Sequence, residues 1–218
     1  MKDQIEKAID LVLEGQRDDF FKLLDQQNVN YIARPDGLVD VYGNVSLTDL
    51  SLTKIPIQFG VVTGYFNCTV NQLTSLEGSP QEVGGWFACA HNQLTSLIGC
   101  PEKIGGGFEC SHNQLTSLKG CAEEIGGYFY CNNNQLTSLI EGPKKIDGTF
   151  DCSFNHLTSL RGCPEKIGGG LFCDGNPVEF TKEDIILAKQ GKAPLGLPLS
   201  WVLMKKKEKE LSFPHEKL

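Results

Sequence analysis

Cysteine and histidine are the residues whose types and spacing could do chemistry in this chain. It contains nine cysteines and four histidines, which raises the possibilities of disulfides, a zinc site or a nucleophile. No Cys-x-x-Cys pair occurs, and an odd number of thiols leaves one without a disulfide partner. Six cysteines recur at a step of 21 residues, which favours small buried apolar side chains and reduced thiols in a cytoplasm. They are Cys68, Cys89, Cys110, Cys131, Cys152 and Cys173.

His91 and His112 occupy the same position in consecutive repeats. On stacked strands their rings would lie side by side at about 5 Å, and two histidines can share a metal. Asn133 and Phe154 fill that position further on, however, and no carboxylate completes a ligand shell. We interpret the position as a tolerant surface site whose two histidines are candidates for contact with a partner. Neither a metal nor another cofactor is expected.

Paired glycines such as Gly105-Gly106 resemble phosphate-binding loops, but no G-x-x-x-x-G-K-[ST] motif occurs. Because the pair recurs once per repeat, we interpret it as a bend with positive φ where adjacent coils approach closely. No Ser-His-Asp arrangement stands out, and every cysteine has an explanation in packing. The chain is therefore not predicted to be an enzyme.

The element that positions these residues is a unit of 21 residues, Phe-x-Cys-x-x-Asn-x-Leu-x-x-Leu, followed by a turn, Ile or Val, and the glycine pair. A degenerate first copy begins near Val45. Alternation along a strand sends Phe66 and Cys68 inward. The asparagine of each unit, such as Asn71, is predicted to satisfy backbone groups where the chain leaves the strand. Stacked coils must bury this inner ring against one another, so the ends need caps.

This unit resembles the leucine-rich repeat from Asn44 to Val178, within the length range of that class. Its "LTSL" segment is similar to bacterial and bacteriophage repeats, including those of type III secreted effectors. Those usually carry Leu-Pro after "LTSL", where this chain has "GCPEKIGGGF". The resemblance implies an α/β repeat solenoid, a coil stack with a parallel β-sheet. It divides the chain into an N-terminal helical cap and edge segment (1–43), the array (44–178) and a C-terminal helical cap and tail (179–218).

The two ends of the chain have helical rather than repeat patterns. A helical hairpin is predicted from two apolar periodicities that meet at Gly15, followed by edge strands around the turn at Pro35. At the other end, Thr181 is a predicted N-cap for a helix that stops at Gly191. A second short helix is expected around Trp201, where it would seal the last coil.

Charge and hydropathy restrict the partners. The formal net charge is −7, which would repel phosphate backbones, so nucleic acid is not expected. No secretory signal and no apolar run of membrane-spanning length are found, so a membrane is not expected either. The predicted location is the cytoplasm of a bacterium or an infected host cell.

Outward positions on the strands differ from repeat to repeat, and specificity should therefore reside there. Aromatic side chains with polar neighbours are typical of binding hot spots, although outward rings also stack between coils and stiffen a sheet. We predict capture of a partner protein on this concave strand face, with the resemblance suggesting an inhibitor or adaptor that acts on a host protein. The alternatives are a structural subunit that packs into a larger assembly or homo-oligomer, and a small-ligand site. Besides His91 and His112, the candidate contact residues are Tyr65, Asn67, Trp86, Glu109, Tyr128, Tyr130, Asp151 and Phe172.

Overall fold

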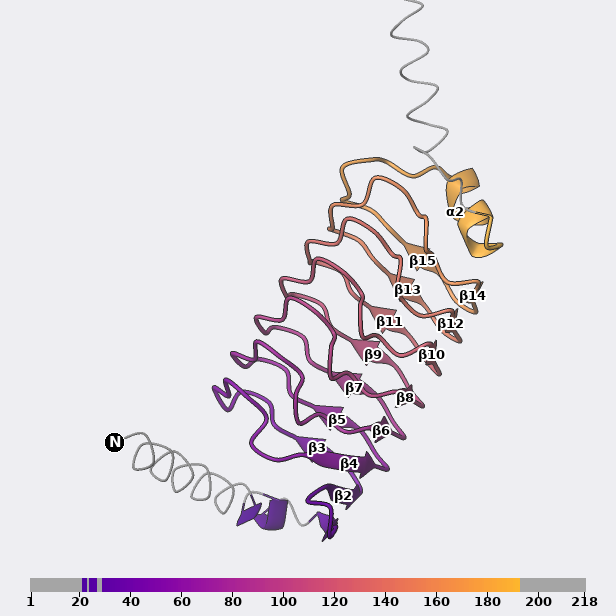
Figure 1. Cartoon of the computed structure of the whole chain (residues 1–218). Coiled ribbons are helices and arrows are strands. Elements are labelled where there is room, and N and C mark those ends of the chain that lie inside the picture. The colour runs from indigo at the N-terminus through magenta and orange to yellow at the C-terminus, as the bar shows by residue number, and fades with distance from the viewer. Residues whose placement is uncertain (1–20, 23, 27–28, 193–218) are drawn as a thin grey trace, which may run out of the picture.

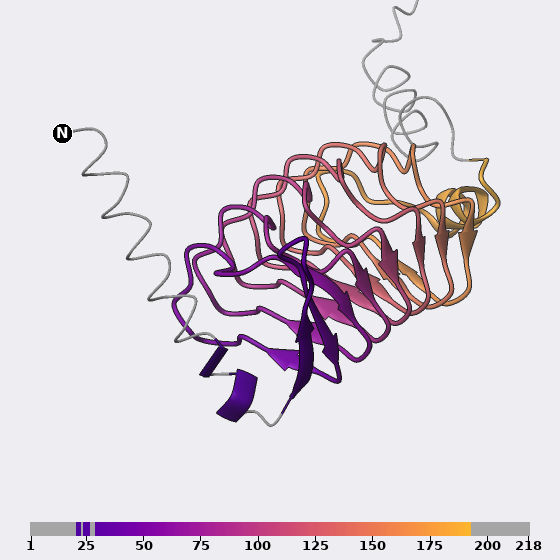
Figure 2. The same ribbon diagram turned by 60° about the horizontal axis from the view of Figure 1, so that its bottom comes forward.

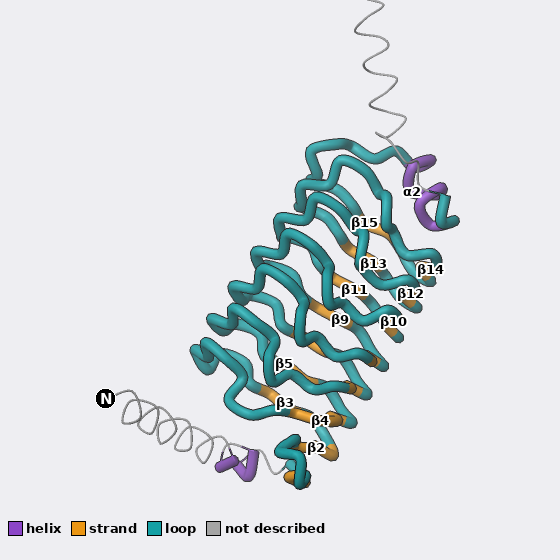
Figure 3. Tube along the Cα trace, in the orientation of Figure 1, coloured by secondary structure: helices purple, strands orange, loops and turns teal. Residues whose placement is uncertain are grey.

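The chain forms a stack of similar coils, each one repeat long, that rise along a single axis (Figures 1 and 2). The computed structural model describes residues 21–22, 24–26 and 29–192. Most of each coil is loop, and only short segments are strands (Figure 3). These strands form two parallel sheets that run side by side along the stack. The fold is therefore a β-solenoid of 21-residue coils.

The eight-stranded sheet begins with an antiparallel hairpin, in which Tyr31 lies opposite Val41, and continues in parallel. Its hairpin turns at Gly37, where φ is 87°, in agreement with the edge strands predicted from the sequence. Its strands, in spatial order, are β1 (Asn30–Ala33), β2 (Val39–Tyr42), β4 (Phe59–Val62), β6 (Glu82–Val83), β8 (Lys103–Ile104), β10 (Glu124–Ile125), β12 (Lys145–Ile146) and β14 (Lys166–Ile167).

The seven-stranded sheet is the one predicted from the Phe-x-Cys pattern. Its register is the repeat itself: Phe129 lies opposite Phe108 on one side and Phe150 on the other. The first copy pairs as expected, Val45 with Phe66. Its strands are β3 (Val45–Ser46), β5 (Phe66–Asn67), β7 (Phe87–Ala88), β9 (Phe108–Glu109), β11 (Phe129–Tyr130), β13 (Phe150–Asp151) and β15 (Leu171–Phe172).

The core lies between the two sheets and the turn that follows them. The phenylalanine rings of successive coils stack along its length, with centroids 5.2 Å apart between Phe108 and Phe129. Both rings, the Cys110 side chain and both leucines of each "NQLTSL" segment, such as Leu115 and Leu118, are fully buried. Since one coil cannot enclose these side chains alone, neighbouring coils stabilise each other.

The asparagine ladder has the role predicted for it. The Nδ2 group of Asn113 donates to the carbonyl oxygens of Cys89, Cys110 and Ser111 at 3.0, 3.2 and 3.2 Å. Its Oδ1 atom accepts the backbone N–H of Leu94 at 3.0 Å. One side chain thus satisfies groups in its own coil and the preceding one.

The glycine pairs allow the coils to approach, but the prediction of positive φ for them was wrong. A Cβ atom built on Gly126 would overlap the carbonyl oxygen of Gly105 in the coil before it. Positive φ occurs instead at the turn glycines, such as Gly99 at 89°. The pair is therefore selected for the distance between two backbones, and the turn glycine for its dihedral angle.

The described ends of the chain contain helical residues, whereas their role as caps stays a prediction. Residues 21–22 and 24–26 are helical, and Leu24 is fully buried in the core. Helix α2 (Lys182–Lys189) begins at Thr181, which forms a capping box with Asp184. Lys189 Nζ donates to the carbonyl oxygen of Gly169 at 2.7 Å, so α2 lies against the last coil (Figure 1). The first predicted helix and the one around Trp201 fall outside the described residues. Among the residues described, no helix has the length and apolar character needed to cross a membrane.

Candidate protein-binding face

The outward side of the seven-stranded sheet, here called the strand face, contains the predicted contact residues of every coil. Its side chains point away from the core because they alternate with the buried phenylalanine and cysteine. The loops before and after each strand add a position on either side. The structure places on this face Tyr65, Asn67, Trp86, Glu109, Tyr128, Tyr130, Asp151 and Phe172.

Four aromatic side chains form two stacked pairs. The rings of Tyr65 and Trp86, from adjacent coils, lie 4.5 Å apart between centroids at an interplanar angle of 13°. Tyr128 and Tyr130, from the same strand region, stack at 4.4 Å and 26°. All four are partly exposed. Stacking between coils, which the sequence left open as an alternative, does occur for the first pair, and it holds these two rings in a defined position.

Small residues separate the two aromatic pairs. Ala88 and Ala90 are 1 % exposed although they alternate outward. A Cβ atom on Gly107 would collide with the Tyr128 ring, which lies over that glycine. Gly107 therefore positions Tyr128, a role that the sequence analysis missed. The signal was present, since the equivalent position in the neighbouring coils is Trp86 or Tyr128 itself.

Carboxylates on the strand face alternate with aromatic rings along one row. Glu109, Tyr130, Asp151 and Phe172 are direct neighbours on consecutive strands. Glu109 accepts a hydrogen bond from Ser111 Oγ at 3.3 Å, and Asp151 Oδ1 accepts the Ser153 N–H at 2.9 Å. Burial, the Glu109 carboxylate and the Tyr130 hydroxyl raise the pKa of Tyr128. The charge of Glu109 thus acts on the Tyr128 hydroxyl.

The other sheet presents a different surface. Its outward positions alternate in sign from β6 to β12, and Lys103 binds Glu82 while Lys145 binds Glu124 and Asp147. Such exposed pairs contribute little to stability. The paired groups neutralise one another, so this surface has the character of a solvated face on which several carboxylates already bind a lysine.

His91 and His112 stack with ring centroids 4.3 Å apart and planes 8° apart, close to the spacing predicted. The nitrogen lone pairs of an imidazole lie in its ring plane, so two stacked rings direct them within separate, nearly parallel planes that do not meet at one metal ion. Over the residues that the structure describes, no cluster of three or more metal-binding side chains exists. Both histidines are exposed beside the strand face.

The histidine position has a property that the sequence analysis did not foresee. Its residues have left-handed backbone, with φ of 56° at Val70, 53° at His91 and 52° at Phe154. Asparagine, aspartate and histidine tolerate this region better than β-branched residues, which explains Asn133 at the same step. Phe154 is 59 % exposed, and this large ring extends the apolar surface at the edge of the strand face.

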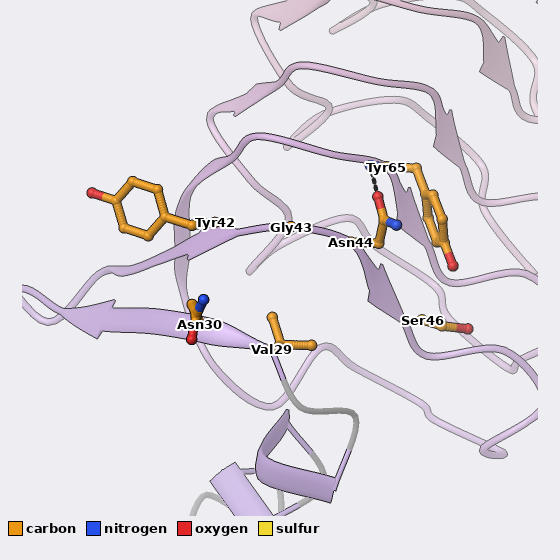
Figure 4. A pocket seen from close by; sticks show the side chains of 7 residues that line it. All are labelled: Val29, Asn30, Tyr42, Gly43, Asn44, Ser46 and Tyr65. Atoms are coloured by element: carbon orange, nitrogen blue, oxygen red, sulfur yellow. Dashed lines mark hydrogen bonds between the residues drawn. The ribbon is translucent and has the colours of Figure 1, made fainter.

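A cavity of about 600 Å³ opens at the N-terminal end of the strand face (Figure 4). It lies between the β1–β2 hairpin and β3, and Asn30, Tyr42 and Tyr65 contribute to its wall. Asn44 Oδ1 accepts the backbone N–H of Tyr65 at 3.0 Å. Tyr65 therefore belongs both to the first aromatic pair and to this cavity, which continues the strand face to the end of the stack.

All nine cysteines are free thiols, and burial raises their pKa values, to about 12 at Cys68 and Cys100 and well above 9.0 at Cys110. We expect the six inward thiols to resist iodoacetamide at pH 8 in the folded protein and to react once urea unfolds it. Mass spectrometry after quenching would measure this. Rapid alkylation of Cys110 in the folded state would contradict the burial.

The same pKa shifts predict a loss of stability at alkaline pH. The unfolded chain releases thiol protons near 9.0, whereas folded Cys68 holds its proton until about 12. The contribution of the buried, protonated thiols to the free energy of unfolding is therefore complete below pH 9 and declines as pH rises towards 12. Urea unfolding at pH 7.5 and 10 would measure this loss for the wild type and for a Cys110→Ala/Cys131→Ala variant. The free energy of unfolding should fall more between the two pH values in the wild type.

Comparison with other proteins assigns the chain to no family. No known family matches the sequence, and no match was found among curated proteins or solved structures. The architecture rests on the 21-residue period and on the register of the strands, which agree throughout the seven-stranded sheet. The chain is a repeat protein with a parallel β-solenoid fold.

Proposed function

We propose that this chain is a non-enzymatic binding module that captures a partner protein on the strand face. The observation that carries the proposal is the presence of two stacked aromatic pairs on this face, Tyr65 with Trp86 and Tyr128 with Tyr130. Rings held in place offer contact area at low entropic expense, and aromatic residues dominate binding hot spots. Solenoids commonly bind partners along such an extended surface.

The specific form of the proposal is an inhibitor or adaptor of bacterial or bacteriophage type that acts on a host protein in the cytoplasm. Support for it comes from the resemblance of the "NQLTSL" unit to leucine-rich repeats of those sources. The free, buried thiols are compatible with a reducing compartment. The proposal includes no cofactor, nucleic acid or membrane.

An affinity experiment with a bacterial lysate tests the proposal. A Trp86→Ala/Tyr128→Ala/Tyr130→Ala variant removes the rings and leaves every buried position intact. We expect a protein retained by the wild type to be lost by this variant, with affinity reduced at least about a hundredfold for three hot-spot residues.

The matched control removes three exposed apolar side chains away from the strand face, Ile98→Ala/Ile140→Ala/Ile186→Ala, which are 60, 47 and 55 % exposed. This control should retain the partner. Equal retention by both variants would contradict binding on the strand face. If no partner is retained and sedimentation shows a dimer at micromolar concentration, the alternative of a self-associating structural subunit is supported instead.

A further inference from the structure

We infer that the partner presents a basic segment whose arginine or lysine side chains lie along the row Glu109, Tyr130, Asp151 and Phe172. This inference rests on the proposed function and adds the chemistry of the partner to it. Its basis is the alternation of carboxylate and ring across four consecutive strands, together with the charge balance of the two sheets.

The charge of the strand face is of one sign. From Asn44 to Asp174, the residues of these strands and the two residues on either side of each include Glu109, Asp151 and Asp174 but no lysine, arginine or histidine. His91 and His112 lie one residue further on. For these three carboxylates the described part of the chain contains no ion pair, whereas on the eight-stranded sheet Glu82, Glu123 and Glu124 each bind a lysine. Within the residues described, the strand-face carboxylates lack the lysine partners that Glu82, Glu123 and Glu124 have, which indicates that the strand face is complemented from outside.

The row suits guanidinium or ammonium groups in two ways at once. A carboxylate binds the cation directly, and guanidinium can make two parallel hydrogen bonds to it. The adjacent ring attracts the same cation through its π face. Because Tyr130 lies between Glu109 and Asp151 in the ladder, a cation at either carboxylate lies beside an aromatic ring.

The spacing of the row also restricts the segment. Glu109 and Asp151 are two strands apart, which corresponds to about 9.6 Å between their Cα atoms. An extended polyproline-type segment advances about 9.3 Å over three residues. A segment that runs along the stack axis with a basic residue at every third position therefore matches the two carboxylates.

The test uses four fluorescent twelve-residue peptides and anisotropy titration of the full chain. The first has arginine at every third position among glycine and serine, the second has lysine there, and the third has citrulline, which keeps the shape of arginine without its charge. The fourth has the same composition as the first with its arginines adjacent. We expect the citrulline peptide to bind at least about tenfold more weakly than the arginine peptide and the adjacent-arginine peptide to bind more weakly as well.

Two variants locate the interaction. Glu109→Gln/Asp151→Asn removes two charges from the row and retains oxygen acceptors for the Ser111 hydroxyl and the Ser153 N–H. Glu82→Gln/Glu124→Gln removes two charges from the other sheet and changes the net charge equally. Binding of the arginine peptide should weaken at least about fivefold in the first variant and remain unchanged in the second.

Three outcomes would overturn the inference: no binding of the arginine peptide, equal binding of the citrulline peptide, or equal loss in both charge variants, which would indicate only bulk attraction. These outcomes are separable from failure of the proposed function. A partner from the lysate that is lost with the aromatic variant but retained by Glu109→Gln/Asp151→Asn leaves the strand face as the binding surface and refutes the basic segment alone.

Discussion

Replacement of Asn113 with alanine is expected to lower the free energy of unfolding by about 4 kcal/mol, one of the two largest effects predicted for this protein. The substitution removes hydrogen bonds to three backbone carbonyls and one backbone N–H. All of these groups are buried, and each unpaired group contributes about 1–3 kcal/mol, reduced where a carbonyl keeps a second partner. Urea unfolding monitored by circular dichroism would measure the change.

Position along the ladder provides the control for this prediction. Asn176 makes similar bonds at the end of the array, to Cys152, Cys173 and Leu157, but it is only partly buried. Water can replace its bonds, so Asn176→Ala should reduce stability by about 2 kcal/mol. The exposed neighbour Gln114 should tolerate alanine within about 0.5 kcal/mol. Equal losses at Asn113 and Asn176 would argue against burial as the cause.

The substitution Gly126→Ala should have the second large effect and lower the free energy of unfolding by about 3 kcal/mol. The added methyl group meets the backbone of Gly105, and not the movable end of a side chain. The two coils must therefore separate, which lengthens the hydrogen bond from Gly126 N–H to the Ile104 carbonyl, 3.0 Å in the native structure. Thermal and urea unfolding of the variant would measure the loss.

The substitution Gly191→Ala is the control, because it tests the effect of a positive φ without contact between neighbouring coils. Gly191 has φ of 68°, and a Cβ atom there would meet nothing within 4 Å. Its substitution should reduce stability by only about 1 kcal/mol, the usual effect of a left-handed residue other than glycine. A loss at Gly191 as large as that at Gly126 would show that coil spacing is not what the glycine pairs protect.

The period in the sequence was sufficient to predict the seven-stranded sheet and which of its side chains face the core. Phe66 and Cys68 point inward, Val45 takes the place of phenylalanine in the first copy, and the asparagine ladder satisfies backbone groups as expected. These predictions succeeded because every coil repeats the same inward side chains in the same order. A single repeat with such a pattern would have been ambiguous between strand and loop.

The eight-stranded sheet was not predicted because each repeat offers only one buried side chain for it, such as Ile104 in β8. The other sheet has an alternating buried pair, phenylalanine and cysteine, in each repeat. A signal did exist across the repeats, since Glu82, Lys103, Glu124 and Lys145 alternate in charge at the 21-residue step. Oppositely charged neighbours on adjacent strands are typical of a sheet. The left-handed position was missed for a related reason: backbone dihedrals are shared by residues as different as Val70 and His91, so side-chain type gives only a weak indication.

The uniform register of the seven-stranded sheet makes the strand face a molecular ruler. Each coil advances the array by one strand, about 4.8 Å, and the pairing of Phe87, Phe108 and Phe129 contains no shift. The distance from the Trp86 pair to the Tyr128 pair is thus counted in whole coils. Gain or loss of one 21-residue unit between the two pairs would change that distance by about 4.8 Å. The same core contacts would form in every coil, so the spacing of the aromatic pairs can change in fixed steps while the core stays the same.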